Sequence, residues 1–217
     1  MTDFAARRRM MVDTQVRPSD VTKFPIIDAM LKVAREAFVP NAQREAAYAD
    51  QMVPLGGGRY MLEPRTLAKI LDWLSIGLED SVLDIGSGYG YSAAVAAHMA
   101  QFVVAVESDE AMAQEAQEIL SEVSADNAIV HNGPLAEGAE EHGPYDVIMI
   151  QGGVEEVPQA LLDQLKDGGR IACIFMDNNL GTVRVGYSNA GQITWRFAFN
   201  AGAPVLEGFE KRRSFAL

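Results

Sequence analysis

One nine-residue stretch near the middle of the chain constrains the fold more than any other. Residues 82–90 have the sequence VLDIGSGYG, an apolar strand pattern that runs into glycines at alternate positions. Glycine lets the backbone turn sharply and lets a ligand approach without a Cβ in the way. In open parallel sheets, ligands bind at the carboxyl ends of the strands, where the strand order reverses. The stretch therefore predicts a strand–turn–helix unit with a ligand at the turn.

The sequence around this stretch is typical of a doubly wound α/β sheet. Apolar strand patterns occur at residues 82–85, 102–106, 128–130, 147–150 and 170–175. Helical patterns separate them at residues 92–99, 110–120 and 158–165. Strands that are apolar on both faces and alternate with helices indicate a parallel sheet covered on both sides. Residues 182–187 and 193–199 flank an Asn-Ala-Gly turn, which predicts a hairpin. We expect a Rossmann-like, mostly parallel sheet of about seven strands that is antiparallel at its C-terminal end.

The first 80 residues have a different pattern, rich in helices and loops. Thr22 is a candidate cap for a helix that has Phe24 on its apolar side and Pro25 in its first turn. Pro64 is expected to open a second amphipathic helix, whose apolar positions are Leu67, Ile70, Leu71 and Leu74. We therefore divide the chain into an N-terminal cap, residues 1–80, and a cofactor-binding domain, residues 81–217, which together form one compact unit.

The amino-acid composition restricts which binding partners and which cellular compartment we expect. The 217 residues carry a formal net charge of −12, which disfavours nucleic acid and anionic membranes as partners. Residues 1–11 precede no long apolar run, so neither a signal peptide nor a membrane helix is expected. Cys173 is the single cysteine, which favours a reducing, cytoplasmic location. The three histidines are scattered in the sequence, so we predict no metal site.

The order of charges and glycines discriminates between two cofactor classes. A dinucleotide fingerprint requires a third glycine or an alanine at the position of Tyr91, but here the third glycine falls one residue early, at Gly90. Asp84, two residues before the first glycine, would repel a pyrophosphate. S-adenosylmethionine instead carries an ammonium and a sulfonium, which a carboxylate attracts. The order D-x-G-x-G-x-G therefore favours S-adenosylmethionine over a nicotinamide dinucleotide.

A second carboxylate supports binding of an adenosine. Glu107 ends the next predicted strand, about 20 residues after the glycines, where an acidic side chain bonds ribose hydroxyls. Asn132 is a candidate acceptor for the adenine amine, although Asn132 and Gly133 are equally compatible with a simple tight turn. The predicted cofactor-binding residues are Asp84, Gly86, Ser87, Gly88, Glu107, Ser108, Asn132, Gly133 and Gln151.

Two longer strings resemble the protein-L-isoaspartate O-methyltransferases. Residues 20–40 are similar to that family's D-V-T-D, V-L-x-A-M and V-P-R-E-x-F-V-P motifs. Residues 144–170 are similar to its P-Y-D-x-I, V-P-x-x-L and Q-L-K-x-G-G-R motifs. With the glycine turn, the resemblance covers residues 10–175 approximately. It implies carboxyl O-methylation of isoaspartyl residues in damaged proteins, with a peptide or protein substrate. For the chain itself we expect a monomer or weak homodimer.

The sequence departs from the family where the acceptor is expected. The family motif Q-T-I-S-x-P corresponds here to residues 59–64, so Leu62 occupies the serine position and cannot donate a hydrogen bond to a carboxylate. Arg59 and Tyr60 are the candidate replacements for that donor. Glu63 would bring a negative charge near an anionic substrate. The sequence thus leaves open isoaspartyl methylation, methylation of another acceptor, and a non-catalytic S-adenosylmethionine binder.

Overall fold

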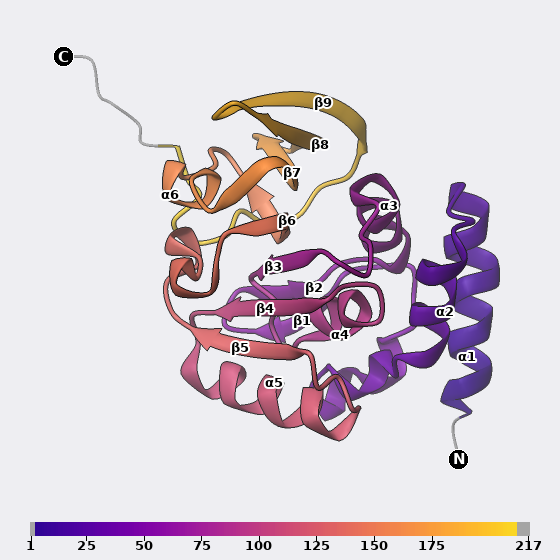
Figure 1. The fold of residues 1–217 in the computed structure, drawn as a ribbon. Coiled ribbons are helices and arrows are strands. Elements are labelled where there is room, and N and C mark those ends of the chain that lie inside the picture. Colours follow the sequence, from indigo (N-terminus) through magenta and orange to yellow (C-terminus); the bar gives the residue numbers. More distant parts are fainter. Residues whose placement is uncertain (1–2, 212–217) are drawn as a thin grey trace.

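A seven-stranded sheet forms the centre of the protein (Figure 1). The computed structural model describes residues 3–211, so the outer ends of the two predicted segments, 1–2 and 212–217, lie outside the described residues. In spatial order the strands are β5 (Ala128–Asn132), β4 (Phe102–Glu107), β3 (Ser81–Ile85), β6 (Tyr145–Val154), β7 (Leu165–Asp177), β8 (Leu180–Asn189) and β9 (Gln192–Asn200). The first five are parallel to one another, and the β7–β8 and β8–β9 pairs are antiparallel. The predicted fold class is confirmed.

The last two strands form the expected hairpin. Its turn places Ala190 at φ 50° and Gly191 at φ 76°. Two successive residues with positive φ match the right-handed twist of the paired strands. The Ala190 amide also donates to Oδ1 of Asp167 at 2.6 Å, which ties the turn to the sheet.

Alternating side chains of the central strands build two hydrophobic layers. One layer, which includes Val82, Val103 and Val147, packs against the helices of the N-terminal segment and against α4 and α5. The other layer, which includes Leu83 and Ile148, packs against α6 and the segment that follows β9. The helices are α1 (Phe4–Met11), α2 (Phe24–Lys32), α3 (Pro64–Leu74), α4 (Tyr91–Ala97), α5 (Glu110–Glu122) and α6 (Gln159–Leu162). Figure 1 shows α1, α2 and α3 on the side of the sheet opposite to α6.

The N-terminal segment is mostly helical, but it contains elements that the sequence pattern does not indicate. Helix α1 continues through a π-helical turn (Val12–Val16), and a small hairpin pairs β1 (Val53–Gly56) with β2 (Arg59–Met61). These strands are too short to show a periodic pattern in the sequence. The three consecutive glycines do not indicate where the turn lies. The β1–β2 hairpin lies against the candidate site.

Several expected helix details are corrected by the structure. The N-cap of α2 is Lys23 rather than Thr22, without a side-chain cap, and Phe24 is exposed rather than packed. The helix predicted over 158–165 is a single turn, because the chain enters β7 at Leu165. By contrast, α3 begins at Pro64 and buries the four predicted apolar side chains.

The topology defines where ligands are expected. From β3 the chain moves outward to β4 and β5, and it then returns to the other side of β3 at β6. The carboxyl ends of β3 and β6 therefore flank the switch point, where open α/β sheets bind their ligands. Across residues 3–211, no helix has the length and apolar character needed to span a bilayer.

Candidate active site

The glycine turn connects β3 to α4 at the switch point. Gly86 and Gly88 have φ angles of 72° and 57°, a left-handed region that is strained for residues with a Cβ. A Cβ on Gly88 would also lie 2.5 Å from Cδ1 of Leu55 in β1. The turn therefore needs glycine for its path, and it presents bare backbone beside the β1–β2 hairpin.

Asp84 lies in β3 and is completely buried. Ser92 Oγ donates to its Oδ2 at 2.5 Å, and Gln151 Nε2 donates to its Oδ1 at 2.7 Å. Because both partners are neutral, burial raises the pKa of Asp84 to about 7, although the two hydrogen bonds counteract the effect. A buried carboxylate whose partners are uncharged is a favourable neighbour for a cationic ligand.

Glu107, at the end of β4, is also completely buried but has a charged partner. Its Oε1 accepts from the amides of Ser108 (2.8 Å) and Asp109 (3.1 Å), and its Oε2 accepts from the Gly88 amide (3.1 Å). Arg59 Nε lies 3.1 Å from both oxygens, and Arg59 Nη2 donates to Ser108 Oγ at 2.6 Å. A carboxylate offers about four acceptor positions, so a ribose hydroxyl at Glu107 has to compete with Arg59.

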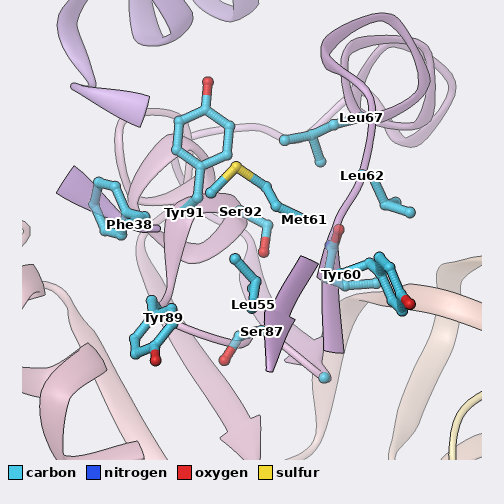
Figure 2. Close-up of a pocket in the computed structure, with 12 residues that line it drawn as sticks. Phe38, Leu55, Tyr60, Met61, Leu62, Leu67, Ser87, Tyr89, Tyr91 and Ser92 are labelled. Carbon is cyan, nitrogen blue, oxygen red and sulfur yellow. The ribbon is translucent and has the colours of Figure 1, made fainter. Parts of the chain in front are cut away.

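A narrow pocket lies between the glycine turn and the segment from β2 to α3 (Figure 2). Its lining residues are Phe38, Leu55, Tyr60, Met61, Leu62, Leu67, Gly86, Ser87, Tyr89, Tyr91, Ser92 and Gln151. It encloses about 10 Å³, which is room for roughly one water molecule. A larger group therefore enters only if lining side chains, such as Leu55 from the β1–β2 hairpin, move.

Two hydroxyl groups in this pocket are buried without a hydrogen-bond partner. They are Ser87 Oγ, in the glycine turn, and the Tyr91 hydroxyl, at the start of α4. The Tyr91 ring lies 4.8 Å from the guanidinium carbon of Arg35, which interacts with its hydroxyl. Buried polar groups are nearly always paired, so the Ser87 hydroxyl is the one that indicates a place for a polar ligand atom. Asp84 adjoins the pocket through its partners Ser92 and Gln151, which line it, and it has no charged partner.

The segment predicted to contact the acceptor, residues 59–63, contains a buried apolar side chain. Leu62 is only 3% exposed, and its carbonyl accepts from Nη2 of the buried Arg35 at 2.6 Å. Figure 2 shows Met61 extending towards Tyr91, whereas Tyr60 and Leu62 lie on the other side of this segment. Arg59 is not among the pocket-lining residues, because its guanidinium is held at Glu107. Of the two candidate donors, only Tyr60 lines the pocket.

Glu63, the expected source of repulsion, is engaged locally. Its Oε2 accepts from Thr66 Oγ1 at 3.1 Å and from Arg65 Nε at 3.2 Å. These contacts turn the carboxylate towards the first turn of α3 and partly neutralise it. Its charge is therefore less available to repel an anionic acceptor than the sequence suggests.

A second hollow lies beyond Glu107, at the carboxyl end of β5. Asn132 Nδ2 and the Gly133 amide both donate to the Glu107 carbonyl, at 3.0 and 3.1 Å. Ser108 and Gly133 line the hollow together with residues 134–136 and 207–208. The predicted adenine-side residues thus adjoin the predicted ribose carboxylate, and Asn132 uses its amide nitrogen rather than its oxygen to fix this loop.

Sequence reasoning missed three residues that shape the site. Ser92 is the hydroxyl partner of Asp84, and its position in the first turn after the glycines is a usable signal. Leu55 lies against Gly88, and Arg35 fixes the Leu62 carbonyl from 27 residues away. Neither of these contacts has a local sequence signal, because both are made between distant parts of the chain.

Comparison with known proteins agrees with this geometry. Residues 7–193 match the family model of protein-L-isoaspartate(D-aspartate) O-methyltransferases. A protein-L-isoaspartate O-methyltransferase of Roseiflexus sp. (strain RS-1) is 36% identical over 169 residues, which is 78% of this chain and 77% of that protein. Protein-L-isoaspartate O-methyltransferase 2 of Pelobacter propionicus is 36% identical over 185 residues, covering 83% and 82% of the two chains.

Solved structures show the same fold. A protein-L-isoaspartate O-methyltransferase with 25% identity superposes with a TM-score of 0.80, over 93% of this chain and 66% of the other. A putative protein-L-isoaspartate O-methyltransferase from Plasmodium falciparum, solved with S-adenosyl-L-homocysteine, has 18% identity and a TM-score of 0.79, with 95% and 99% coverage.

Proposed function

Because the chain belongs to the protein-L-isoaspartate(D-aspartate) O-methyltransferase family, we propose that it methylates the carboxylate of isoaspartyl residues in proteins. S-adenosylmethionine is the methyl donor. The observation that carries the proposal is the pair of buried carboxylates, Asp84 and Glu107, at the two strand ends beside the glycine turn. Among the described residues, Arg59 is the cationic partner of Glu107, whereas Asp84 has no cationic partner.

The residues at the switch point fit the methyl donor. Asp84 is suited to its cationic part, the unpaired Ser87 hydroxyl to a polar group at the turn, and Glu107 to the ribose hydroxyls. Ser108 and Gly133 line the second hollow, and Asn132 adjoins it, which supports this hollow as the adenine side. Gln151 donates to Asp84. When bound, S-adenosylmethionine supplies a methyl group that its sulfonium already activates for transfer.

Methyl transfer to a carboxylate requires the protein mainly to position the acceptor oxygen and the methyl donor. A side-chain carboxyl has a pKa of about 4 in water, so the acceptor is already ionised near neutral pH and needs no strong base. The narrow pocket, with apolar lining from Phe38, Met61 and Leu67, leaves little room for water beside an acceptor. Alignment of the acceptor oxygen in a dry pocket is then the main source of acceleration.

Leu62 supports a second candidate, methylation of a different acceptor. Its buried side chain provides no hydroxyl where the family has serine, and Arg59 is committed to Glu107. Tyr60 is the remaining hydroxyl on the predicted acceptor segment that lines the pocket. An acceptor less dependent on such a hydrogen bond than an isoaspartyl carboxylate would suit this lining.

A methyl-transfer assay separates these candidates. Wild-type protein is incubated with methyl-labelled S-adenosylmethionine and either an isoaspartyl peptide or its aspartyl counterpart. We expect base-labile label on the isoaspartyl peptide only, and loss of transfer in Asp84→Ala. Label on neither peptide, together with retained S-adenosylmethionine binding, would instead support another acceptor or a non-catalytic binder.

A further inference from the structure

Two of the three histidines, which are far apart in sequence, meet at the surface of the fold. His131 lies in β5, and His142 is the last residue of the short 3₁₀ helix η6 (Glu140–His142). Their rings face each other edge to face, with centroids 6.1 Å apart and an interplanar angle of 80°. His131 and His142 therefore adjoin in space although they are separate in the sequence, and the third, His98, is absent from the cluster.

A carboxylate lies between the two rings. Glu141 Oε1 is 3.3 Å from His131 Nδ1 and 3.4 Å from His142 Nε2. One ligand atom from each of the three side chains lies within 4.8 Å of the other two. Nitrogen and oxygen ligands at about 2.1 Å from a tetrahedral zinc ion are separated by roughly 3.4 Å. The two separations that involve Glu141 already have this value. The third, between the two imidazole nitrogens, is at most 4.8 Å, and a small rotation of the His142 side chain shortens it.

The surroundings favour a cation. The hollow beside His131 and Glu141 is also lined by Glu137, Glu140 and Asp163, and the whole chain carries a formal charge of −12. Such a field concentrates cations near the surface. The three ligand side chains are between 26% and 67% exposed, so an ion can reach them from solvent without a structural opening.

From this geometry we propose that His131, Glu141 and His142 form a binding site for a divalent transition-metal ion, best suited to Zn²⁺. Two imidazoles and one carboxylate are a ligand set that zinc accepts, with solvent in the remaining position. Ca²⁺ and Mg²⁺ prefer all-oxygen ligands and are poor occupants. The site shares no lining residue with the narrow pocket or the second hollow, although His131 adjoins the predicted adenine-side residues Asn132 and Gly133.

Calorimetric titration with zinc chloride tests the site on protein from which any histidine tag has been removed. We expect one zinc ion per chain in the wild type. His142→Ala and Glu141→Gln are each expected to weaken that binding at least tenfold, because each removes a ligand. His98→Ala is the matched control, since it removes a histidine outside the cluster, and it is expected to bind zinc like the wild type.

The titration can contradict the proposed zinc site in several ways. Wild-type affinity in both His142→Ala and Glu141→Gln, or equal weakening in His98→Ala, would overturn the proposal, as would the absence of stoichiometric binding in the wild type. A second readout uses cobalt(II) chloride, whose visible absorption intensifies in a tetrahedral nitrogen and oxygen site. We expect this band in the wild type and in His98→Ala and its loss in His142→Ala. Circular dichroism verifies that each variant is folded.

Discussion

At the scale of single residues, the ionisation of Asp84 links the site to the stability of the fold. Its pKa is raised from 3.8 to about 7 in the folded protein, so the folded state holds this proton more tightly than the unfolded chain. The Asp84 contribution to the free energy of unfolding is therefore largest below pH 4 and declines as the pH rises to about 7.

Replacing Asp84 with asparagine removes that decline. Between pH 5 and pH 8 we expect the wild type to lose about 2–3 kcal/mol more unfolding free energy than Asp84→Asn, measured by urea denaturation without cofactor at both pH values. An identical pH dependence in the two proteins would show that the Asp84 carboxyl is not perturbed.

We predict that Leu62 limits how well the pocket holds a carboxylate. In Leu62→Ser the new hydroxyl is expected to donate to the acceptor, a charged hydrogen bond worth about 1.5–3 kcal/mol. We therefore expect kcat/KM for the isoaspartyl peptide to rise about tenfold or more. Leu62→Ala is the control, because it removes the same bulk without adding a donor. Equal activity in the serine and alanine variants would place the acceptor away from residue 62.

At the scale of secondary-structure elements, the β1–β2 hairpin is joined to β4 by the Arg59–Glu107 ion pair, whose side chains are 7% and 0% exposed. Removing one partner of a buried pair leaves the other uncompensated, which costs about 3–5 kcal/mol. Backbone amides still satisfy part of Glu107, so we expect Arg59→Gln to lower the free energy of unfolding by about 2–4 kcal/mol.

Arg65→Gln is the matched control for this element contact. Its ion pairs with Asp50 and Glu63 are substantially exposed, and exposed pairs contribute at most about 1 kcal/mol. Denaturant unfolding of both variants measures the difference. A cost for Arg59→Gln no greater than that for Arg65→Gln would argue against a structural role for the buried pair.

Sequence patterns predicted the elements whose periodicity is unbroken. The central strands, the amphipathic helix α3 and the terminal hairpin all have such periodicity or a specific turn, and all are present. The β1–β2 hairpin has neither, because four- and three-residue strands flank a run of glycines. The helix expected over 158–165 is shortened because backbone pairing of β7 with β6 takes over at Leu165.

The site was predictable where its residues belong to a motif of characteristic spacing. Asp84 precedes the first glycine by two residues and Glu107 ends the adjacent strand, so motif spacing was sufficient to nominate them. The pairing of Arg59 with Glu107 spans 48 residues, and the contact of Leu55 with Gly88 depends on how the hairpin folds back. Such contacts follow from tertiary packing, which spacing along the chain does not encode.

At the scale of the whole molecule, the N-terminal cap and the sheet share one hydrophobic core. Met11, Met30 and Phe38 from the cap belong to the same buried cluster as Val82 and Val147 from the sheet. We propose that the two predicted segments unfold as one cooperative unit, because neither can expose its side of this cluster without exposing the other.

The two tryptophans allow this cooperativity to be measured. Trp73 lies in α3 of the cap and Trp195 lies in β9 at the far edge of the sheet. In the single-tryptophan variants Trp195→Phe and Trp73→Phe, the fluorescence transition is expected to coincide with that variant's own far-ultraviolet circular dichroism transition. A cap probe that melts separately from the secondary structure would show two independent units.

We propose above all that the turn after β3 holds a cationic sulfur nucleoside against Asp84. Calorimetric titration with S-adenosylmethionine at pH 8 and pH 6 tests it most directly. Because the pKa of Asp84 is about 7 and a bound cation favours its ionised form, we expect about tenfold weaker binding at pH 6 in the wild type. Asp84→Asn should bind at least tenfold more weakly at pH 8 and show little further loss at pH 6. Equal affinity of the two proteins at pH 8 would contradict the claim.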